Sequence, residues 1–106
     1  HIHDRRQRQM CIRDRTMDGK MYKANTQNNI GYSYIQLEDY DNALIHLNKA
    51  IEIKPKEGMF YSDKGDALYY LGKEDDACAN YIKSSELGYE EIKDYLNSSD
   101  GDWCKK

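Results

Sequence analysis

The sequence has a single proline and no long apolar run. A helix needs roughly 20 mostly apolar residues to cross a bilayer, and no stretch approaches that length. The basic N-terminal segment is followed by no apolar signal-peptide core. We therefore expect a cytoplasmic protein without a membrane partner. The scarcity of proline, the ten tyrosines and the 33% of charged residues favour one small helical domain for this chain of 106 residues.

Cysteine is also scarce, and the three cysteines follow no paired motif. An odd number without such a motif argues against a disulfide framework and against a zinc site. We expect Cys11, Cys78 and Cys104 to be reduced thiols. Cys78 directly follows Ala77, and we expect it to pack as a small hydrophobic residue.

Arginine is absent after residue 15, whereas the first fifteen residues contain all five arginines. With Asp4 and Asp14 the segment carries a charge of +3, which leaves −6 for the rest of a chain whose total is −3. Its apolar residues show neither helical nor strand periodicity, so we predict disorder for residues 1–16. The run "RQMCIRDR" resembles translated sequencing-adapter read-through. A non-native extension ahead of Met17 or Met21 is therefore an alternative interpretation.

The same segment offers two candidate binding functions. His1, His3 and Asp4 are metal-ligand residue types, but no second ligand cluster accompanies them. The arginines could contact nucleic acid or anionic lipid, although the acidic remainder of the chain opposes polyanion binding. We predict that the chain binds neither a metal ion nor nucleic acid.

The rest of the chain contains an internal repeat. Identical or similar residues recur 34 positions apart, which is the signature of a repeated structural unit. Within each copy an apolar helical pattern of about fourteen residues breaks at "LEDYD" or "LGKED" and then resumes, so each unit is predicted to be a helical hairpin. Acidic residues follow each break and suit the start of the second helix. The matched pairs are Gly31 and Gly65, Leu37 and Leu71, Asp41 and Asp75, Ala43 and Ala77, and Leu47 and Tyr81.

These residues resemble the tetratricopeptide repeat family over about residues 24–98. The positions of the family pattern are occupied in the first copy by Gln27, Ile30, Gly31, Tyr34, Ala43, Leu47 and Pro55. In the second copy they are occupied by Tyr61, Lys64, Gly65, Leu68, Ala77 and Tyr81. Gln27 departs from the family tryptophan and Lys64 from its aliphatic residue.

The resemblance implies an all-α solenoid of tandem antiparallel helical hairpins with a short capping helix. The repeat domain would span residues 17–98, with repeat one at about 24–57, repeat two at about 58–88 and the capping helix at about 89–98. Residues 99–106 would form a flexible tail from which Trp103 folds back onto the cap.

The repeated glycines have a physical explanation in this fold. Glycine inside a helix costs roughly 0.5–1 kcal/mol relative to alanine, so its retention indicates a close approach of another helix. We expect Gly31 and Gly65 to face Ala43 and Ala77 of the second helices. Flanking apolar residues, Leu37 and Ile82 among them, are expected in the buried faces.

The resemblance also implies a function, namely a protein-interaction scaffold that holds a peptide or helix in a concave groove lined by the first helices. Tyrosines and amides suit an extended polypeptide, although tyrosine at these positions could serve packing alone. The groove residues implied by position are Asn25, Asn28, Tyr32, Ile35, Gln36, Met59, Ser62, Asp66, Tyr69 and Tyr70.

The charge of the groove indicates the charge of its ligand. Chaperone-binding members of the family clamp a C-terminal carboxylate with lysine and arginine on this face. The corresponding region here contains Asn28, Tyr32, Asp63 and Asp66. We therefore expect a neutral to basic partner.

The sequence shows no candidate catalytic site, since its titratable residues do not converge in one place. His46 is expected on an outer surface, and "DYDN" and "SSDGDW" lack a full calcium-ligand series. We expect no enzyme activity and no cofactor. About three repeats are normally needed to bury a continuous core. The alternative function is therefore a fragment or self-associating unit of a longer repeat array, for example a homodimer.

Overall fold

The computed structural model describes residues 19–105, which are helical throughout apart from short turns. The predicted disorder of residues 1–16 lies outside this range. Five α-helices are followed by one 3-10 helix, and the described residues contain no strand. In chain order these are α2 (Gly19–Gln36), α3 (Tyr40–Ile53), α4 (Gly58–Tyr70), α5 (Glu74–Glu86), α6 (Glu90–Asn97) and the 3-10 helix η1 (Ser99–Lys105).

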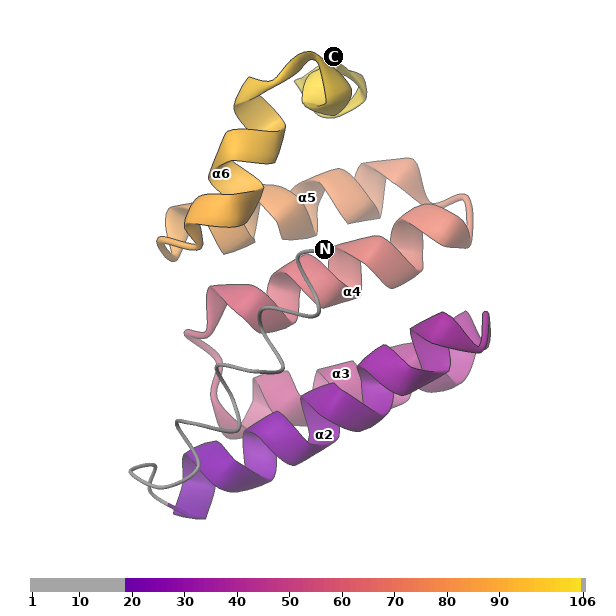
Figure 1. Ribbon diagram of the computed structural model, residues 1–106, viewed down its shortest axis with the longest axis vertical. Coiled ribbons are helices and arrows are strands. Elements are labelled where there is room, and N and C mark those ends of the chain that lie inside the picture. The colour runs from indigo at the N-terminus through magenta and orange to yellow at the C-terminus, as the bar shows by residue number, and fades with distance from the viewer. Residues whose placement is uncertain (1–18, 106) are drawn as a thin grey trace.

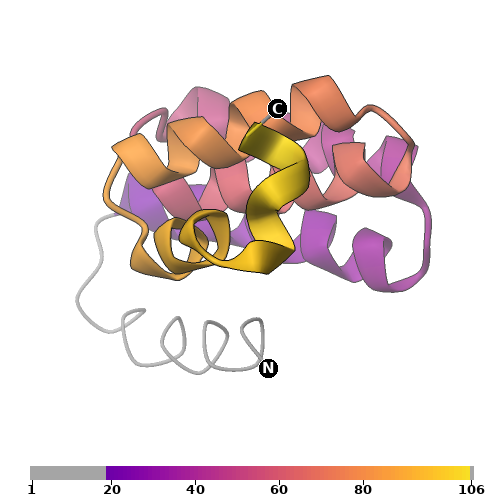
Figure 2. The ribbon, with the colours of Figure 1, turned by 90° about the horizontal axis from the view of Figure 1, so that it is seen from above.

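The helices form stacked antiparallel pairs (Figure 1). Helix α2 packs along α3, α4 packs along α5, and α3 joins the two hairpins by packing against α4. Helix α6 packs on the side of α5 that faces away from the first hairpin. The 3-10 helix η1, at the C-terminal end of the described chain, packs against α6 and contacts α5 (Figure 2). This arrangement confirms the predicted all-α fold of tandem helical hairpins with a capping helix.

The breaks between helices follow from local backbone chemistry. Glu38 adopts a left-handed φ of 61°, and Asp39 then caps α3 by accepting a hydrogen bond from the Asn42 amide at 3.3 Å. Gly72 and Gly88 have φ values of 82° and 90°, a region that favours glycine at a helix end. The predicted side-chain cap is confirmed for α3. Helix α5 instead has no side-chain cap and carries three acidic residues in its first turn.

The repeated glycines mark the closest approach within each hairpin. A Cβ atom on Gly31 would lie 2.7 Å from Leu47 Cγ and 3.2 Å from the Ala43 carbonyl oxygen. A Cβ atom on Gly65 would lie 2.8 Å from the Tyr81 ring and 3.2 Å from the Ala77 carbonyl oxygen. The predicted close approach is confirmed. The tightest contacts come from Leu47 and Tyr81, which lie one helical turn after Ala43 and Ala77.

Adding a single methyl group at this contact should destabilise the hairpin. We expect Gly65→Ala to lower the free energy of unfolding by about 1–3 kcal/mol, because the buried Tyr81 ring must shift to admit the new atom. Gly19→Ala is the matched control, since a Cβ there meets nothing within 4 Å. Urea denaturation of both variants measures the difference. Equal stability of the two would contradict the packing argument.

Two groups of buried residues hold the hairpins together. The first lies between the repeats, with Phe60 fully buried beside Ala24, Ala50 and Met59. The second group joins Ala43 and Leu47 of α3 to Ala67 of α4, and partly buried hydrophobic residues pack around it. The prediction that Leu37 and Ile82 are buried was wrong. They are 74% and 44% exposed, Leu37 in the turn after α2 and Ile82 on α5.

The C-terminal residues differ most from expectation. Residues 99–105, predicted as a flexible tail, form η1 and turn back toward α5. A disulfide joins Cys78 of α5 to Cys104 of η1, so the prediction of reduced thiols was wrong for this pair. The fold brings their Cα atoms to 5.1 Å across a separation of 26 residues, within the range that a disulfide requires. The predicted return of Trp103 to the cap is confirmed, because its Nε1 donates to the Tyr95 hydroxyl at 2.7 Å.

Candidate functional site

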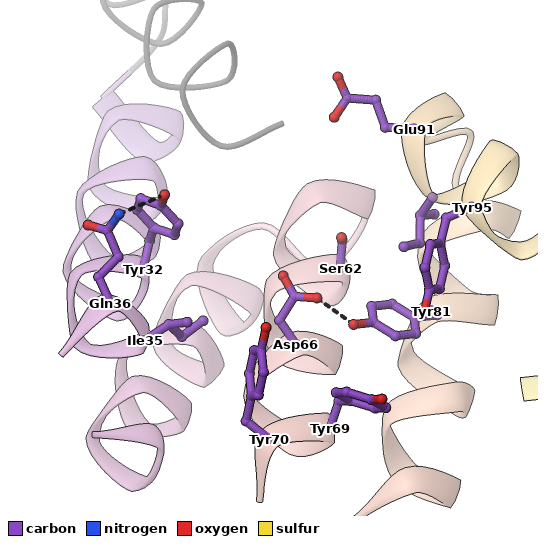
Figure 3. Close-up of a pocket in the computed structure, with 11 residues that line it drawn as sticks. Tyr32, Ile35, Gln36, Ser62, Asp66, Tyr69, Tyr70, Tyr81, Glu91 and Tyr95 are labelled. Carbon is purple, nitrogen blue, oxygen red and sulfur yellow. Dashed lines mark hydrogen bonds between the residues drawn. The ribbon is translucent and has the colours of Figure 1, made fainter. Parts of the chain in front are cut away.

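A pocket of about 440 Å³ opens on the face shared by α2, α4 and α6 (Figure 3). These three helices present one side to the pocket, and α5 contributes a single side chain. The lining residues are Tyr32, Ile35 and Gln36 of α2, Ser62, Asp66, Tyr69 and Tyr70 of α4, Tyr81 of α5, and Glu91, Ile92 and Tyr95 of α6.

Most of the groove residues implied by position come together in this pocket. The structure gathers Tyr32, Ile35, Gln36, Ser62, Asp66, Tyr69 and Tyr70 there.

Three further groove residues do not line the pocket. Asn25, Asn28 and Met59 are at least 94% buried. Asn28 Nδ2 donates a hydrogen bond of 2.8 Å to Asp63 Oδ2, which ties α2 to α4. Asn28 and Met59 therefore contribute to the packing between helices.

Sequence reasoning missed four lining residues, Tyr81, Glu91, Ile92 and Tyr95. Tyr81 belongs to a second helix, whose residues were assigned to the core. The other three belong to α6, which was treated only as a cap. Because α6 follows α5 as α4 follows α3, it also presents a side to this face (Figure 1). The 34-residue register contained that signal, since Tyr95 stands at the offset of Tyr61.

Hydrogen bonds orient the polar side chains of the pocket. The Tyr81 hydroxyl donates to Asp66 Oδ1, and Gln36 Nε2 donates to the Tyr32 hydroxyl at 3.0 Å. Burial raises the pKa of Tyr81, and the neighbouring Asp66 carboxylate raises that pKa further. The Tyr81 hydroxyl therefore keeps its proton and remains a donor to Asp66.

Aromatic rings form a continuous band along this face. Tyr70, which is 61% exposed, stacks on Tyr40 with ring centroids 5.3 Å apart, and Tyr69 meets Tyr70 edge-on at 5.7 Å. Tyr69 also lies 5.0 Å from the Trp103 ring. Such pairs hold aromatic side chains in defined orientations. The band therefore offers a partner a broad aromatic surface.

The described part of the chain contains no metal site and no membrane-spanning helix. No group of three histidine, cysteine, aspartate or glutamate side chains in residues 19–105 is arranged to hold a metal ion. His46, expected at an outer surface, is half-buried, stacks on Tyr34 at 5.5 Å and shares a 2.8 Å hydrogen bond with Gln27 Oε1. Across the same residues, every helix is too short or too polar to span a membrane.

Comparison with known proteins bears out the repeat. Residues 24–57 match the family model described as "Tetratricopeptide repeat". Residues 24–57 therefore form a tetratricopeptide repeat. Two relatives align over a longer stretch than that one repeat. The "Protein STIP1 homolog" of Dictyostelium discoideum is 30% identical over 83 residues, or 78% of this chain. "Stress-induced-phosphoprotein 1" of Caenorhabditis elegans is 32% identical over 73 residues, or 68% of this chain.

These relatives are much longer than this chain. The chain spans 15% of the length of the Dictyostelium relative and 22% of the length of the Caenorhabditis relative. The similarity therefore concerns one repeat-containing portion of each relative.

Proposed function

We propose that this chain is a protein-interaction module that binds a peptide or a helix of a partner protein in the pocket between α2, α4 and α6. The observation that carries the proposal is the 440 Å³ pocket lined by five tyrosines, two of which are more than a third exposed. Tyrosine gives a large contact area with little loss of side-chain entropy, and its hydroxyl can bond a peptide backbone. The tetratricopeptide family and the two relatives support a binding role rather than a catalytic one.

The proposed partner segment is neutral to basic. The pocket lining contains two carboxylates, Asp66 and Glu91, and no lysine or arginine side chain. Lysine and arginine are attracted both to carboxylates and to the faces of tyrosine rings. A C-terminal carboxylate is disfavoured at the corresponding position, because Asn28 and Asp63 there bond each other in a buried site.

The experiment uses a peptide selected from a random display library against the folded chain. We expect Tyr32→Ala with Tyr69→Ala to weaken binding of that peptide by about 2 kcal/mol or more, the scale of an aromatic hot spot. Isothermal calorimetry measures the affinity. Raised salt should slow association of a basic peptide, because ions screen its attraction to the acidic surface.

Control variants separate binding from folding. Tyr70→Ala removes an exposed pocket residue and should weaken binding while leaving the circular dichroism spectrum unchanged. Tyr22→Ala removes a tyrosine of α2 that is 54% exposed and lies outside this pocket, so affinity should stay constant. Unchanged affinity in the folded double variant would refute this site. Sedimentation showing a dimer of the chain, together with such unchanged affinity, would favour self-assembly instead.

A further inference from the structure

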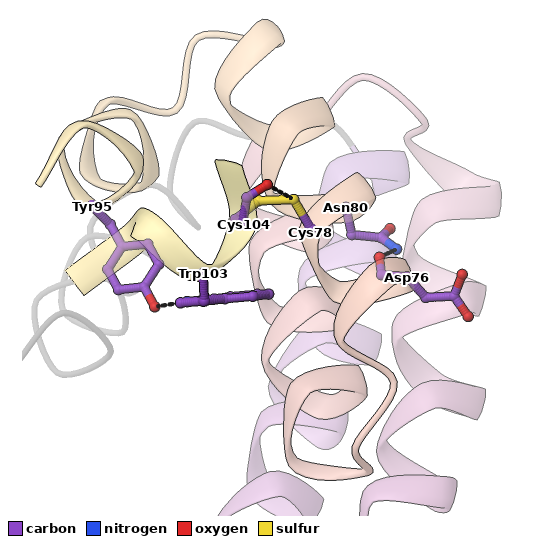
Figure 4. Close-up of a disulfide and its surroundings, with 6 residues drawn as sticks. All are labelled: Asp76, Cys78, Asn80, Tyr95, Trp103 and Cys104. Carbon is purple, nitrogen blue, oxygen red and sulfur yellow. Dashed lines mark hydrogen bonds between the residues drawn. A yellow bond between two sulfur atoms is a disulfide. The ribbon is translucent and has the colours of Figure 1, made fainter. Parts of the chain in front are cut away.

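The Cys78–Cys104 disulfide fastens one side of the pocket. It joins the middle of α5 to η1, and the residue before Cys104 is Trp103 (Figure 4). The Trp103 ring lies 5.0 Å from Tyr69 and 5.9 Å from Tyr81, measured between ring centroids. Its Nε1 donates to the Tyr95 hydroxyl at 2.7 Å. One side chain therefore supports three pocket-lining tyrosines from three different helices.

Besides the disulfide, η1 is held by the Trp103–Tyr95 hydrogen bond and by the packing of Gly101 on α6. A 3-10 helix of seven residues has poor hydrogen-bond geometry and no stability of its own. Its buried Gly101 packs closely on α6, where an added Cβ would lie 2.8 Å from Leu96 Cα. The disulfide is the covalent link of η1 to α5 and keeps Trp103 over the pocket tyrosines.

We propose that this disulfide is a redox-controlled fastening whose reduction releases Trp103 from the pocket tyrosines and weakens binding at the pocket. The effect on binding rests on the proposed function, whereas the release of Trp103 does not. Cys78 and Cys104 are both half-buried, so a small dithiol can reach the bond. In the cytoplasm, where we expect this chain, thiols are kept reduced and a disulfide is typically a transient sensor.

The chemistry is thiol–disulfide exchange with a dithiol reductant. A thiolate of the reductant attacks one sulfur of the pair and forms a mixed disulfide, which releases the other cysteine as a thiolate that takes up a proton. The second thiol of the reductant then displaces the remaining cysteine and closes its own disulfide. Two electrons and two protons pass to Cys78 and Cys104, and the reductant is oxidised.

Trp103 itself reports the release, because it is the single tryptophan of the chain. A Cys11→Ser background leaves only the disulfide pair to titrate. We expect reduction by dithiothreitol to shift Trp103 emission to longer wavelength and to raise its quenching by acrylamide about threefold, as for a locally opened segment. In the same background, Cys78→Ser with Cys104→Ser should resemble the reduced chain and should not respond to dithiothreitol.

A second measurement tests the pocket. The display-selected peptide should bind the reduced chain at least about fivefold more weakly than the oxidised chain, because the tyrosines lose their preorganisation. If thiol titration shows complete reduction but Trp103 emission and quenching are unchanged, the proposal that the disulfide holds Trp103 is overturned. Release of Trp103 with unchanged peptide affinity would overturn its control of binding. Failure of any selected peptide to bind the oxidised chain would instead refute the proposed function, and fluorescence would still decide the fastening.

Discussion

Replacing Phe60 with alanine is expected to lower the free energy of unfolding by about 3–5 kcal/mol, the usual cost of emptying a buried aromatic site. Phe60 has no exposed surface and lies at the start of α4 against Ala24 of α2 and Ala50 of α3. The small partners cannot fill the space that the ring vacates. Urea denaturation followed by circular dichroism measures the loss.

The size of this effect matters because the fold is small. Typical per-residue stabilities give two repeats with a cap roughly 4–10 kcal/mol in total, so the expected loss is a large part of the whole stability. Tyr22→Ala is the control, since it removes an aromatic side chain that is 54% exposed. A loss below about 1 kcal/mol for Phe60→Ala would show that the repeats are held together elsewhere.

Loss of the disulfide is expected to lower stability by about 3–4 kcal/mol, because the bond closes a loop of 26 residues in the unfolded chain. The comparison is between the oxidised chain and the double variant Cys78→Ser with Cys104→Ser, each unfolded in urea. Dithiothreitol should lower the urea midpoint of the oxidised chain to that of the double variant. The variant itself should be insensitive to the reductant. Equal midpoints for the oxidised chain and the variant would contradict the prediction.

The hairpins could be predicted because their information is local or periodic. Gly31 and Gly65 recur with Ala43 and Ala77 at one spacing, and each close contact lies within a single hairpin. Helix boundaries follow residues whose preferences act on their own backbone, such as Asp39 at the cap of α3. Such features depend little on the remainder of the chain.

The pocket was predicted only in part, because a helical register places side chains on a face but does not give their depth. Asn28 and Tyr32 are one turn apart on α2 and are both buried, yet Asn28 bonds Asp63 and only Tyr32 reaches the pocket lining. Tyr81 could not be assigned to the pocket from its own helix, since its ring reaches from α5 toward Asp66 of α4 (Figure 3).

The sequence by itself determined the repeated helical hairpins, the close helix contacts at Gly31 and Gly65, and the tyrosine-rich face of the first helices. Only the tertiary structure decided that Cys78 meets Cys104 and that Trp103 supports the pocket tyrosines. The physical reason is that disulfide formation depends on the distance between two Cα atoms, which separation along the chain does not specify. Here that distance is set by the turn after α6, which directs η1 back across α5.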